Sequence, residues 1–251
     1  MLKEERYDKI LSILDEEKYI SAQKLSKKLF VSLPTIRRDL AELDRRNQII
    51  RSHGGAKAIE PEHIVAPLDF RKTVHSTQKR KLCQAASNLV NDNEIIFIDA
   101  STTTLQMADF LSDKKNITVI TNGIPLAALL VQKGIKTYCT GGEIFQNSLA
   151  HFGSFAEEFI RKFNIDTMIF SCHGVNESGM LTDPSLPETQ IRRVAINQSK
   201  KTVFLCDKSK FSLSTPYNLM PINDINFIVT DYADITHYLE KDGKNKIIIV
   251  K

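Results

Sequence analysis

The chain has 251 residues, 42% of them hydrophobic, which suits one large domain or a small domain joined to a medium one. It contains no apolar run long enough to span a membrane, no apolar signal segment after its charged N-terminus and no closely spaced cysteine pair, so we expect a cytoplasmic protein without a metal or other cofactor. The net charge of +4 arises entirely from residues 1–58, with 13 basic and 9 acidic residues, and this local excess is typical of a nucleic-acid-binding module.

Three helical patterns occupy roughly the first 46 residues. Ser21 and Ser32 precede the second and third patterns as N-caps, and Pro34 fits the first turn of the third helix, where a missing N–H costs little. The apolar positions, spaced as on the buried face of a helix, are Ile10, Ile13 and Leu14, then Ala22, Leu25 and Leu29, and finally Ile36, Leu40 and Leu43. Two such helices joined by a short turn predict a helix-turn-helix.

Polar residues at the start of the third helix are suited to DNA. Thr35, Arg37, Arg38 and Asp39 lie off the predicted apolar face. Arginine reads guanine edges or holds phosphates, and the free N–H groups of a helix start favour phosphate. We therefore expect this helix start, together with the two capping serines, to contact double-stranded DNA.

A short β-hairpin with a glycine turn is predicted over residues 49–56, directly after the third helix. As a wing, it would place Arg51, His53 and Gly54 against the sugar-phosphate backbone or the minor groove. For each of these segments alone, a small helical packing domain with a solvated basic face remains the alternative. Their combination favours a winged helix-turn-helix domain over residues 1–57.

Residues 58–74 contain Pro61 and Pro67 among mixed polar residues and are predicted to be an inter-domain linker. Over residues 75–251, β-rich apolar runs alternate with helical stretches. Strands are predicted at 95–98, 117–121, 136–139, 167–171, 202–205, 227–230 and 246–250. Helices are predicted from Ser76 and at 103–112, 124–132, 154–163, 186–199 and 234–240. This alternation predicts an α/β Rossmann-like domain with a largely parallel sheet.

Polar clusters follow four of these strands, and ligands of parallel sheets bind beyond the carboxyl ends of the strands. The candidate ligand-binding residues are Asp99, Ser101, Thr102, Thr103 and Thr104, then Thr121 and Asn122, then Gly141 and Gly142, and finally Lys208. Hydroxyls and N–H groups at a helix start can hold a phosphate, and a lysine can neutralise it. Each cluster alone is explained by a cap or a turn, but four at one sheet edge predict a site for a phosphorylated ligand.

Two groups of motifs resemble the DeoR family of bacterial transcriptional regulators. The first is T-I-R-R-D-L at 35–40, followed by R-x-H-G-G-A at 51–56. The second is the family pattern of aspartate, any residue, glycine and two threonines, which falls on Asp99 to Thr103. The resemblance covers essentially the whole chain. It implies a sensor domain related to ribose-phosphate isomerase and the coenzyme A transferases, with a phosphorylated sugar or sugar derivative as the usual effector.

The sequence departs from the family pattern twice. Ser101 stands where the family usually has glycine, and Ser171 stands where glycine often closes the strand before His173. If the first glycine serves a positive φ or a close phosphate approach, Ser101 narrows the pocket or adds a hydroxyl contact.

An enzyme on the same fold is the competing interpretation, and it requires a general base. Glu188 and Glu143 are candidates, although a helix-start charge and a loop residue explain them more simply. Cys172 and His173 are adjacent and would point apart on a strand. The attached DNA-binding module favours sensing over turnover, and an architectural DNA binder would leave the α/β domain unexplained. We therefore expect a homo-oligomeric repressor of a sugar-catabolic operon, released by a phosphorylated sugar, with no catalytic residues.

Overall fold

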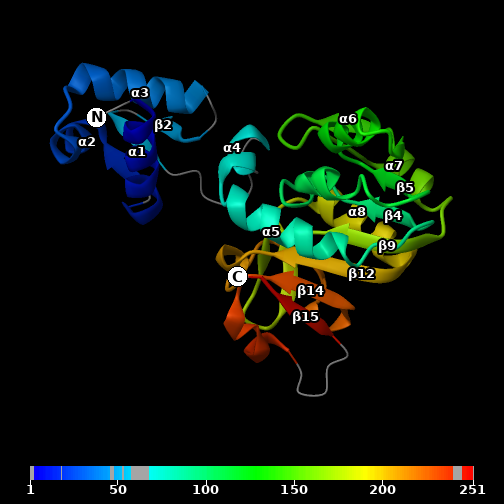
Figure 1. The fold of residues 1–251 in the computed structure, drawn as a ribbon. Coiled ribbons are helices and arrows are strands. Elements are labelled where there is room, and N and C mark those ends of the chain that lie inside the picture. The colour runs from blue at the N-terminus through cyan, green and yellow to red at the C-terminus, as the bar shows by residue number, and fades with distance from the viewer. Residues whose placement is uncertain are drawn as a thin grey trace. The chain divides into compact units, whose positions relative to one another are not determined.

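A computed structural model describes residues 3–17, 19–45, 48–52, 54–57, 68–239 and 245–250. Contacts divide the chain into a first unit, residues 1–67, and a second unit, residues 68–251 (Figure 1). His53 and residues 58–67 of the predicted linker lie outside the described residues. No helix in the described part of the chain is long and apolar enough to cross a membrane.

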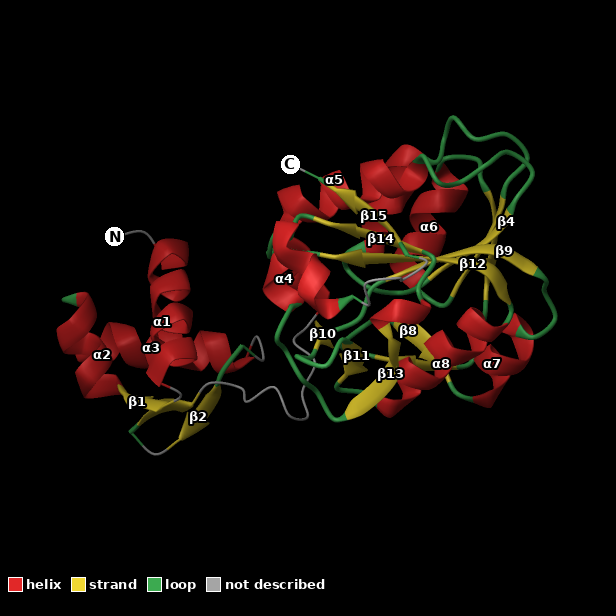
Figure 2. Cartoon of the chain, turned by 90° about the horizontal axis from the view of Figure 1, so that it is seen from below, coloured by secondary structure: helices red, strands yellow, loops and turns green. Residues whose placement is uncertain are grey.

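The described residues of the first unit form three helices and a small antiparallel sheet (Figures 1 and 2). The elements are α1 (Lys3–Glu17), β1 (Tyr19–Ser21), α2 (Ala22–Leu29), α3 (Leu33–Arg45), β2 (Ile50–Ser52) and β3 (Gly55–Lys57). Strands β2 and β3 are the predicted wing hairpin, and β3 also pairs with β1, a strand that the sequence did not predict. Three residues are too few to display an alternating pattern.

The predicted apolar face of each helix forms the core of the first unit. Ile10, Leu25 and Ile36, one from each helix, are fully buried. Ser21 caps α2 as predicted, because its hydroxyl accepts a hydrogen bond from the Lys24 N–H at 3.2 Å. Burial of a large aliphatic side chain stabilises a fold by about 1.5–3 kcal/mol, so this small core can hold the third helix in place.

Gly55 fixes the wing against β1. A Cβ atom at this position would lie 2.3 Å from the carbonyl oxygen of Ile20, so only glycine fits. Next to it, Gly54 has a φ of +86° at the turn, and its carbonyl accepts a hydrogen bond from Ala22 N at 2.8 Å. The start of α2 and the wing are therefore tied together.

In its described residues, the second unit is built on a seven-stranded parallel sheet. In sheet order the strands are β15 (Lys246–Ile249), β14 (Phe227–Thr230), β12 (Ser199–Cys206), β9 (Ile165–Phe170), β4 (Ile95–Ile98), β5 (Thr118–Thr121) and β6 (Lys136–Cys139). Each corresponds to a predicted strand, with ends that differ by at most three residues.

Helices cover both faces of this sheet (Figure 2). They are α4 (Leu68–Thr73), α5 (Ser76–Ser87), α6 (Ile124–Gln132), α7 (Ser154–Ile160) and α8 (Leu186–Asn197). Alternate strand residues point to opposite faces, so Ile96 and Ile98 pack with α5 and α6 while Phe97 packs with α7 and α8. Helix α4 lies within the predicted linker, and the structure places it in the second unit.

Short elements complete the second unit. The segments predicted as helices at 103–112 and 234–240 are 3₁₀-helices, η1 (Thr104–Phe110) and η4 (Ala233–Tyr238). Further 3₁₀ turns are η2 (Lys208–Lys210) and η3 (Ile222–Asp224). Five short antiparallel strands were not predicted: β7 (Glu143–Phe145), β8 (Ala150–Phe152), β10 (Gly174–Val175), β11 (Met180–Asp183) and β13 (Tyr217–Pro221).

Candidate functional site

The start of α3 presents basic side chains to solvent. Arg37 and Arg38 are exposed and Thr35 is partly exposed. The exposed Ser32 hydroxyl lies 2.8 Å from the Thr35 hydroxyl. In the wing, Arg51 and Gly54 are exposed, which leaves this set of side chains open to a ligand. Their contacts with DNA remain a prediction.

Asp39 differs from its predicted position, because it is buried rather than on the polar face of α3. Its two carboxylate oxygens accept from Nε of Arg6 at 2.5 Å and from Nη2 of the same guanidinium at 3.0 Å. These hydrogen bonds raise the pKa of Arg6. The bidentate pair joins α1 to α3 and thereby sets the direction of the helix that carries Arg37 and Arg38. Helical spacing gave no signal of it, because the partners are far apart in sequence.

Polar residues converge beyond the carboxyl ends of the parallel strands. Asp99 follows β4, Asn122 follows β5, Ser171 follows β9 and Asp207 follows β12. A cavity of about 280 Å³, including its opening to solvent, lies at this edge. Its lining residues are Arg71, Asp99, Ala100, Ser101, Asn122, Ser148, Phe152, Glu188, Ile191 and Arg192. Of the predicted ligand-binding residues, the structure thus brings Asp99, Ser101 and Asn122 together around one cavity.

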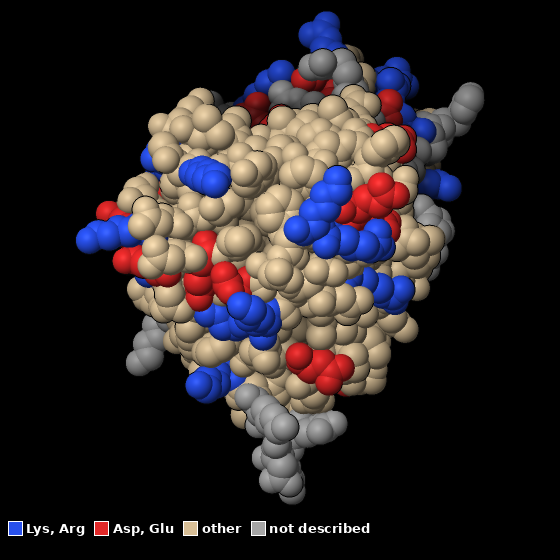
Figure 3. Space-filling view, turned by 90° about the vertical axis from the view of Figure 1, so that its right-hand side faces the viewer, with Lys and Arg blue, Asp and Glu red and all other residues tan. Residues whose placement is uncertain are grey.

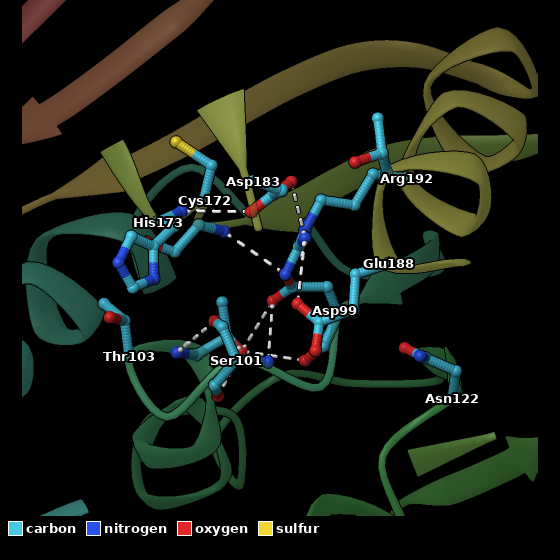
Figure 4. Close-up of polar contacts among 12 residues, drawn as sticks. Asp99, Ser101, Thr103, Asn122, Cys172, His173, Asp183, Glu188 and Arg192 are labelled. Carbon is cyan, nitrogen blue, oxygen red and sulfur yellow. Dashed lines mark hydrogen bonds and ion pairs between the residues drawn. The ribbon is translucent and has the colours of Figure 1, made fainter. Parts of the chain in front are cut away.

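Arg192 organises one side of the cavity (Figure 4). Its Nε donates to Asp99 Oδ2 at 2.9 Å and its Nη1 to Asp183 Oδ2 at 2.7 Å, while Glu188 Oε2 lies 3.6 Å away. Burial alone would lower the pKa of Arg192, but these three carboxylates raise it. The sequence did not single out Arg192 or Asp183 as site residues, since their partners come from distant elements.

Asp99 is engaged within the protein by both of its oxygens. Besides the bond from Arg192, its Oδ1 accepts from Ser101 N at 3.2 Å and from Thr104 Oγ1 at 2.9 Å. Thr121 is likewise buried, and its hydroxyl accepts from Gly123 N at 3.1 Å. These contacts shape the cavity wall.

Two lysines reach the threonine loop that follows β4. Lys79 Nζ donates to Thr102 Oγ1 at 3.1 Å and to the carbonyl of Arg71 at 2.5 Å. Lys210 Nζ lies 3.4 Å from Thr103 Oγ1 and donates to Ser171 Oγ at 2.6 Å. Burial, together with the charge of Lys210, lowers the pKa of Lys79 to about 8. Two ammonium groups therefore lie at this loop, and the carboxylate of Asp207 interacts with both of them.

The sequence assigned the charge-neutralising role to Lys208, but the structure places Lys208 elsewhere. Its side chain is exposed, it does not line the cavity, and its backbone N–H donates to Asp231 Oδ1 at 2.6 Å. Lys210 follows two residues later, on the turn η2, and its ammonium reaches Thr103. The 3₁₀ turn thus decides which of the two lysines points toward Thr103.

Both serines that replace family glycines have structural partners. Ser101 Oγ accepts from Thr104 N at 3.2 Å, and Ser171 Oγ donates to the Leu205 carbonyl at 2.6 Å. Neither serine is among the described residues with a positive φ. A glycine is therefore not needed for the backbone at these positions.

Gly141 and Gly142 line a different, more open hollow between β7 and α7. Gly142 has a φ of +110°, and a Cβ there would lie 2.6 Å from the Phe152 carbonyl oxygen. Glu143 lies in the same hollow, away from the Arg192 cluster. The third predicted cluster thus does not join the cavity at the carboxyl ends of β4 and β5.

Burial shifts the pKa of three of the groups considered for catalysis, Cys172, His173 and Glu188. Burial raises the pKa of Cys172 to about 12, and its thiol donates to the Gly174 carbonyl at 3.1 Å. Burial lowers the pKa of His173, whose backbone N–H donates to Asp183 at 3.0 Å. Figure 4 places both residues at the side of the cluster away from Asn122. Burial also raises the pKa of Glu188, against the lowering effect of Arg192.

Charge on the surface is mixed rather than of one sign. On the face of the molecule drawn in Figure 3, basic and acidic side chains lie beside one another. This agrees with the balance of 21 basic and 21 acidic residues after residue 58. Within the second unit, the ammonium groups of Lys79 and Lys210 lie at the threonine loop.

Comparisons with known proteins match both units. A family model described as the DeoR-like helix-turn-helix domain matches residues 6–62, and one described as the DeoR C terminal sensor domain matches residues 74–232. The repressor GlcR of Bacillus subtilis is 32% identical, with 92% of this chain and 89% of the relative covered. The glycerol-3-phosphate regulon repressor of Escherichia coli is 28% identical, with 92% of both covered. Ribose 5 phosphate isomerase A from Neisseria gonorrhoeae is similar over 53% of this chain and 52% of its own, with 18% identity and a TM-score of 0.41.

Proposed function

Because this chain belongs to the DeoR family of transcriptional regulators, we propose that it represses a sugar-catabolic operon and leaves its operator when a phosphorylated sugar binds. The first unit binds double-stranded operator DNA through the start of α3 and the wing. The second unit binds the effector and holds the chains of a homo-oligomer together. As a DNA-binding regulator it acts in the cytoplasm.

One observation carries the effector assignment: two lysines meet a threonine loop beside a polar cavity at the carboxyl ends of the strands. The ammonium of Lys79 donates to the Thr102 hydroxyl at 3.1 Å, and the ammonium of Lys210 lies 3.4 Å from the Thr103 hydroxyl. A phosphate group is a doubly charged acceptor that such donors hold well. The name of the E. coli relative, which includes glycerol 3-phosphate, supports an effector of this class.

The sugar portion of the effector occupies the adjoining cavity. Arg71, Glu188 and Asn122 line it with charged and polar atoms. The phosphate therefore lies toward Lys79 and Lys210, and the hydroxyl groups lie toward these residues.

Helix α4 connects the effector site to the DNA-binding unit. It is the first element of the second unit, so the chain passes from residues 58–67 directly into it. Arg71 on α4 lines the cavity, its carbonyl accepts from Lys79, and Leu68 is buried beside Ala100 and Leu126. An effector that binds Lys79 and Arg71 favours one position of α4. Differential affinity for two placements of the DNA-binding units then weakens operator binding.

Thermal unfolding of the full-length chain with a panel of sugar phosphates tests this proposal. A ligand that binds the native state raises the unfolding midpoint. We expect at least one sugar phosphate to raise it, while the corresponding free sugar at the same concentration does not. A panel in which free sugars are as effective as their phosphates contradicts the phosphate assignment. Sustained conversion of a sugar phosphate would support the enzyme interpretation instead.

A further inference from the structure

Asn122 is held in one orientation by strand β8. Its backbone carbonyl accepts from His151 N at 2.8 Å, and its side-chain Nδ2 donates to the His151 carbonyl at 3.2 Å. A carbonyl oxygen can only accept, so the amide nitrogen of Asn122 must face it and Oδ1 must face away. The orientation of this amide is therefore fixed by the hydrogen bonds of its neighbour.

The Oδ1 atom of Asn122 is buried and has no hydrogen-bond partner among the described residues. Asn122 is only 2% exposed, and it lines the cavity at the carboxyl ends of β4 and β5. In Figure 4 its amide points toward the Asp99–Glu188–Arg192 cluster. A buried acceptor without a partner costs about 1–3 kcal/mol, and native proteins leave few of them. A group from outside the described residues is needed to satisfy this atom.

The residues that line the cavity around Asn122 Oδ1 restrict the chemistry of the group that can bind there. Glu188 lines the same cavity with a carboxylate, and Ser148 contributes a hydroxyl that makes no hydrogen bond to another described residue. Arg192 is already engaged by Asp99 and Asp183. A phosphate offers only acceptor oxygens near neutral pH, so it does not suit this end of the cavity. A neutral group with an O–H donor suits this end of the cavity, because it can donate a hydrogen bond to Oδ1.

We propose that Asn122 Oδ1 accepts a hydrogen bond from a hydroxyl group of the effector and so determines which phosphorylated polyols the chain recognises. The inference rests on the proposed function, which supplies the phosphorylated effector. It adds an orientation: the phosphate lies at Lys79 and Lys210, and one particular hydroxyl lies at Asn122. A site built to bind a hydroxyl rejects the analogue that lacks it, because the buried acceptor is then left unpaired.

Calorimetric titration of the full-length chain tests the inference. The probes are glycerol 3-phosphate, fructose 1-phosphate, fructose 6-phosphate, glucose 6-phosphate and inorganic phosphate. The tightest-binding ester is then compared with analogues in which each hydroxyl in turn is replaced by hydrogen. One analogue should bind the native chain about 10- to 100-fold more weakly than the parent ester.

The variant Asn122→Leu should lose that discrimination. The substitution replaces the amide, and with it the acceptor, by an apolar side chain of similar size. The variant should therefore bind the parent ester and the critical analogue equally. Its affinity for inorganic phosphate should match that of the native chain. Asn197→Leu, at an exposed position at the end of α8, is the matched control and should keep the full discrimination. Operator binding and the unfolding midpoint verify that each variant is folded.

The outcomes separate the two claims. If esters bind but every analogue binds the native chain as tightly as its parent, Oδ1 serves only an ordered water and the inference is wrong, while the proposed function stands. If Asn122→Leu still binds the parent ester more tightly than the critical analogue, the inference is likewise wrong and the proposed function stands. If no ester binds the native chain, both claims fail. The comparison of analogues needs no variant, so a misfolded Asn122→Leu leaves the inference open to refutation.

Discussion

At the scale of single residues, two exposed arginines at the start of α3 are the proposed contacts with DNA. Arg37 and Arg38 sit on a helix whose opposite face is buried through Ile36, Leu40 and Leu43. Because that face is buried, the side chains of both arginines point away from the core of the first unit into solvent. Their effect on operator binding should therefore be separable from any effect on stability.

Arg38→Ala should weaken binding to a DNA fragment selected for affinity to the full-length chain by about 1–3 kcal/mol, the usual cost of a bidentate base contact. Fluorescence anisotropy measures the affinity, and thermal unfolding shows whether the fold is retained. Arg161→Ala, an exposed arginine on the second unit paired with Glu157, is the control. Equal operator affinity for Arg38→Ala and the native chain would exclude Arg38 from the DNA contacts.

Lys79 should make effector affinity depend on pH. Its pKa of about 8 lies below the ordinary 10.5, because burial and the nearby charge of Lys210 disfavour the ammonium. The folded chain thus loses this proton near pH 8, whereas the unfolded chain keeps it to about pH 10.5. The contribution of Lys79 to the free energy of unfolding therefore rises as the pH increases from 8 to 10.5. Binding of a phosphate needs the charged form. Ester affinity should fall above pH 8 by up to about tenfold per pH unit.

Calorimetric titration between pH 7 and pH 9 measures this dependence. Lys79→Arg is the matched variant, since a guanidinium stays charged throughout the range. Its ester affinity should be flat over the same pH values. An equally steep fall in Lys79→Arg would assign the titration to another group and remove Lys79 from the phosphate contacts.

At the scale of elements, the seven parallel strands were predictable because each is a β-rich run, and the five inner strands β14, β12, β9, β4 and β5 are mostly buried. The short antiparallel strands were not, since β7, β8 and β10 have two or three residues each. The site shows the same division. Asp99 and Asn122 follow predicted strands and were found, whereas Lys210 depends on a 3₁₀ turn and Arg192 on a salt bridge 93 positions away in sequence. The local sequence pattern locates the ends of strands, but it does not reveal which side chains from distant parts of the sequence form salt bridges in the folded chain.

The Arg6–Asp39 pair should be needed for both the stability of the first unit and its DNA binding. Asp39→Ala leaves the largely buried guanidinium of Arg6 without its partner. Loss of one partner costs about 3–5 kcal/mol for a fully buried pair. The cost is smaller here, because the Arg6 side chain is 12% exposed. Chemical denaturation should show a lower midpoint, and operator affinity should fall with it. Arg37→Ala, on the same helix, should lower only operator affinity. An unchanged midpoint for Asp39→Ala would show that the pair does not hold α1 to α3.

Helix α4 should carry the signal from the effector. Leu68→Ala truncates a buried side chain that lines a small cavity together with Ala100 and Leu126, and such a truncation costs about 2–5 kcal/mol for a fully buried leucine. With α4 less firmly attached, the ester should still bind, yet more of it should be required for operator release. Calorimetry and anisotropy measure the two affinities. Identical coupling in Leu68→Ala and the native chain would rule out α4 as the connecting element.

At the scale of the whole molecule, a segment with an excess of positive charge, residues 1–58, is followed by an electrically balanced remainder of the chain, residues 59–251. The excess of 13 basic over 9 acidic residues lies within residues 1–58. Salt should therefore weaken operator binding, which depends on phosphate contacts, more than it weakens the packing of the second unit. The two activities are assigned to different units, so each should be removable without the other.

Operator release by a sugar phosphate tests this division most directly. The complex of the full-length chain with its selected DNA fragment is titrated with the tightest-binding ester, for the native chain and for the double variant Lys79→Gln and Lys210→Gln. We predict equal operator affinity for both proteins without ester, release of the native chain on titration, and continued binding of the double variant. Release of both proteins at the same ester concentration, or of neither by any ester that binds the native chain, would contradict the account.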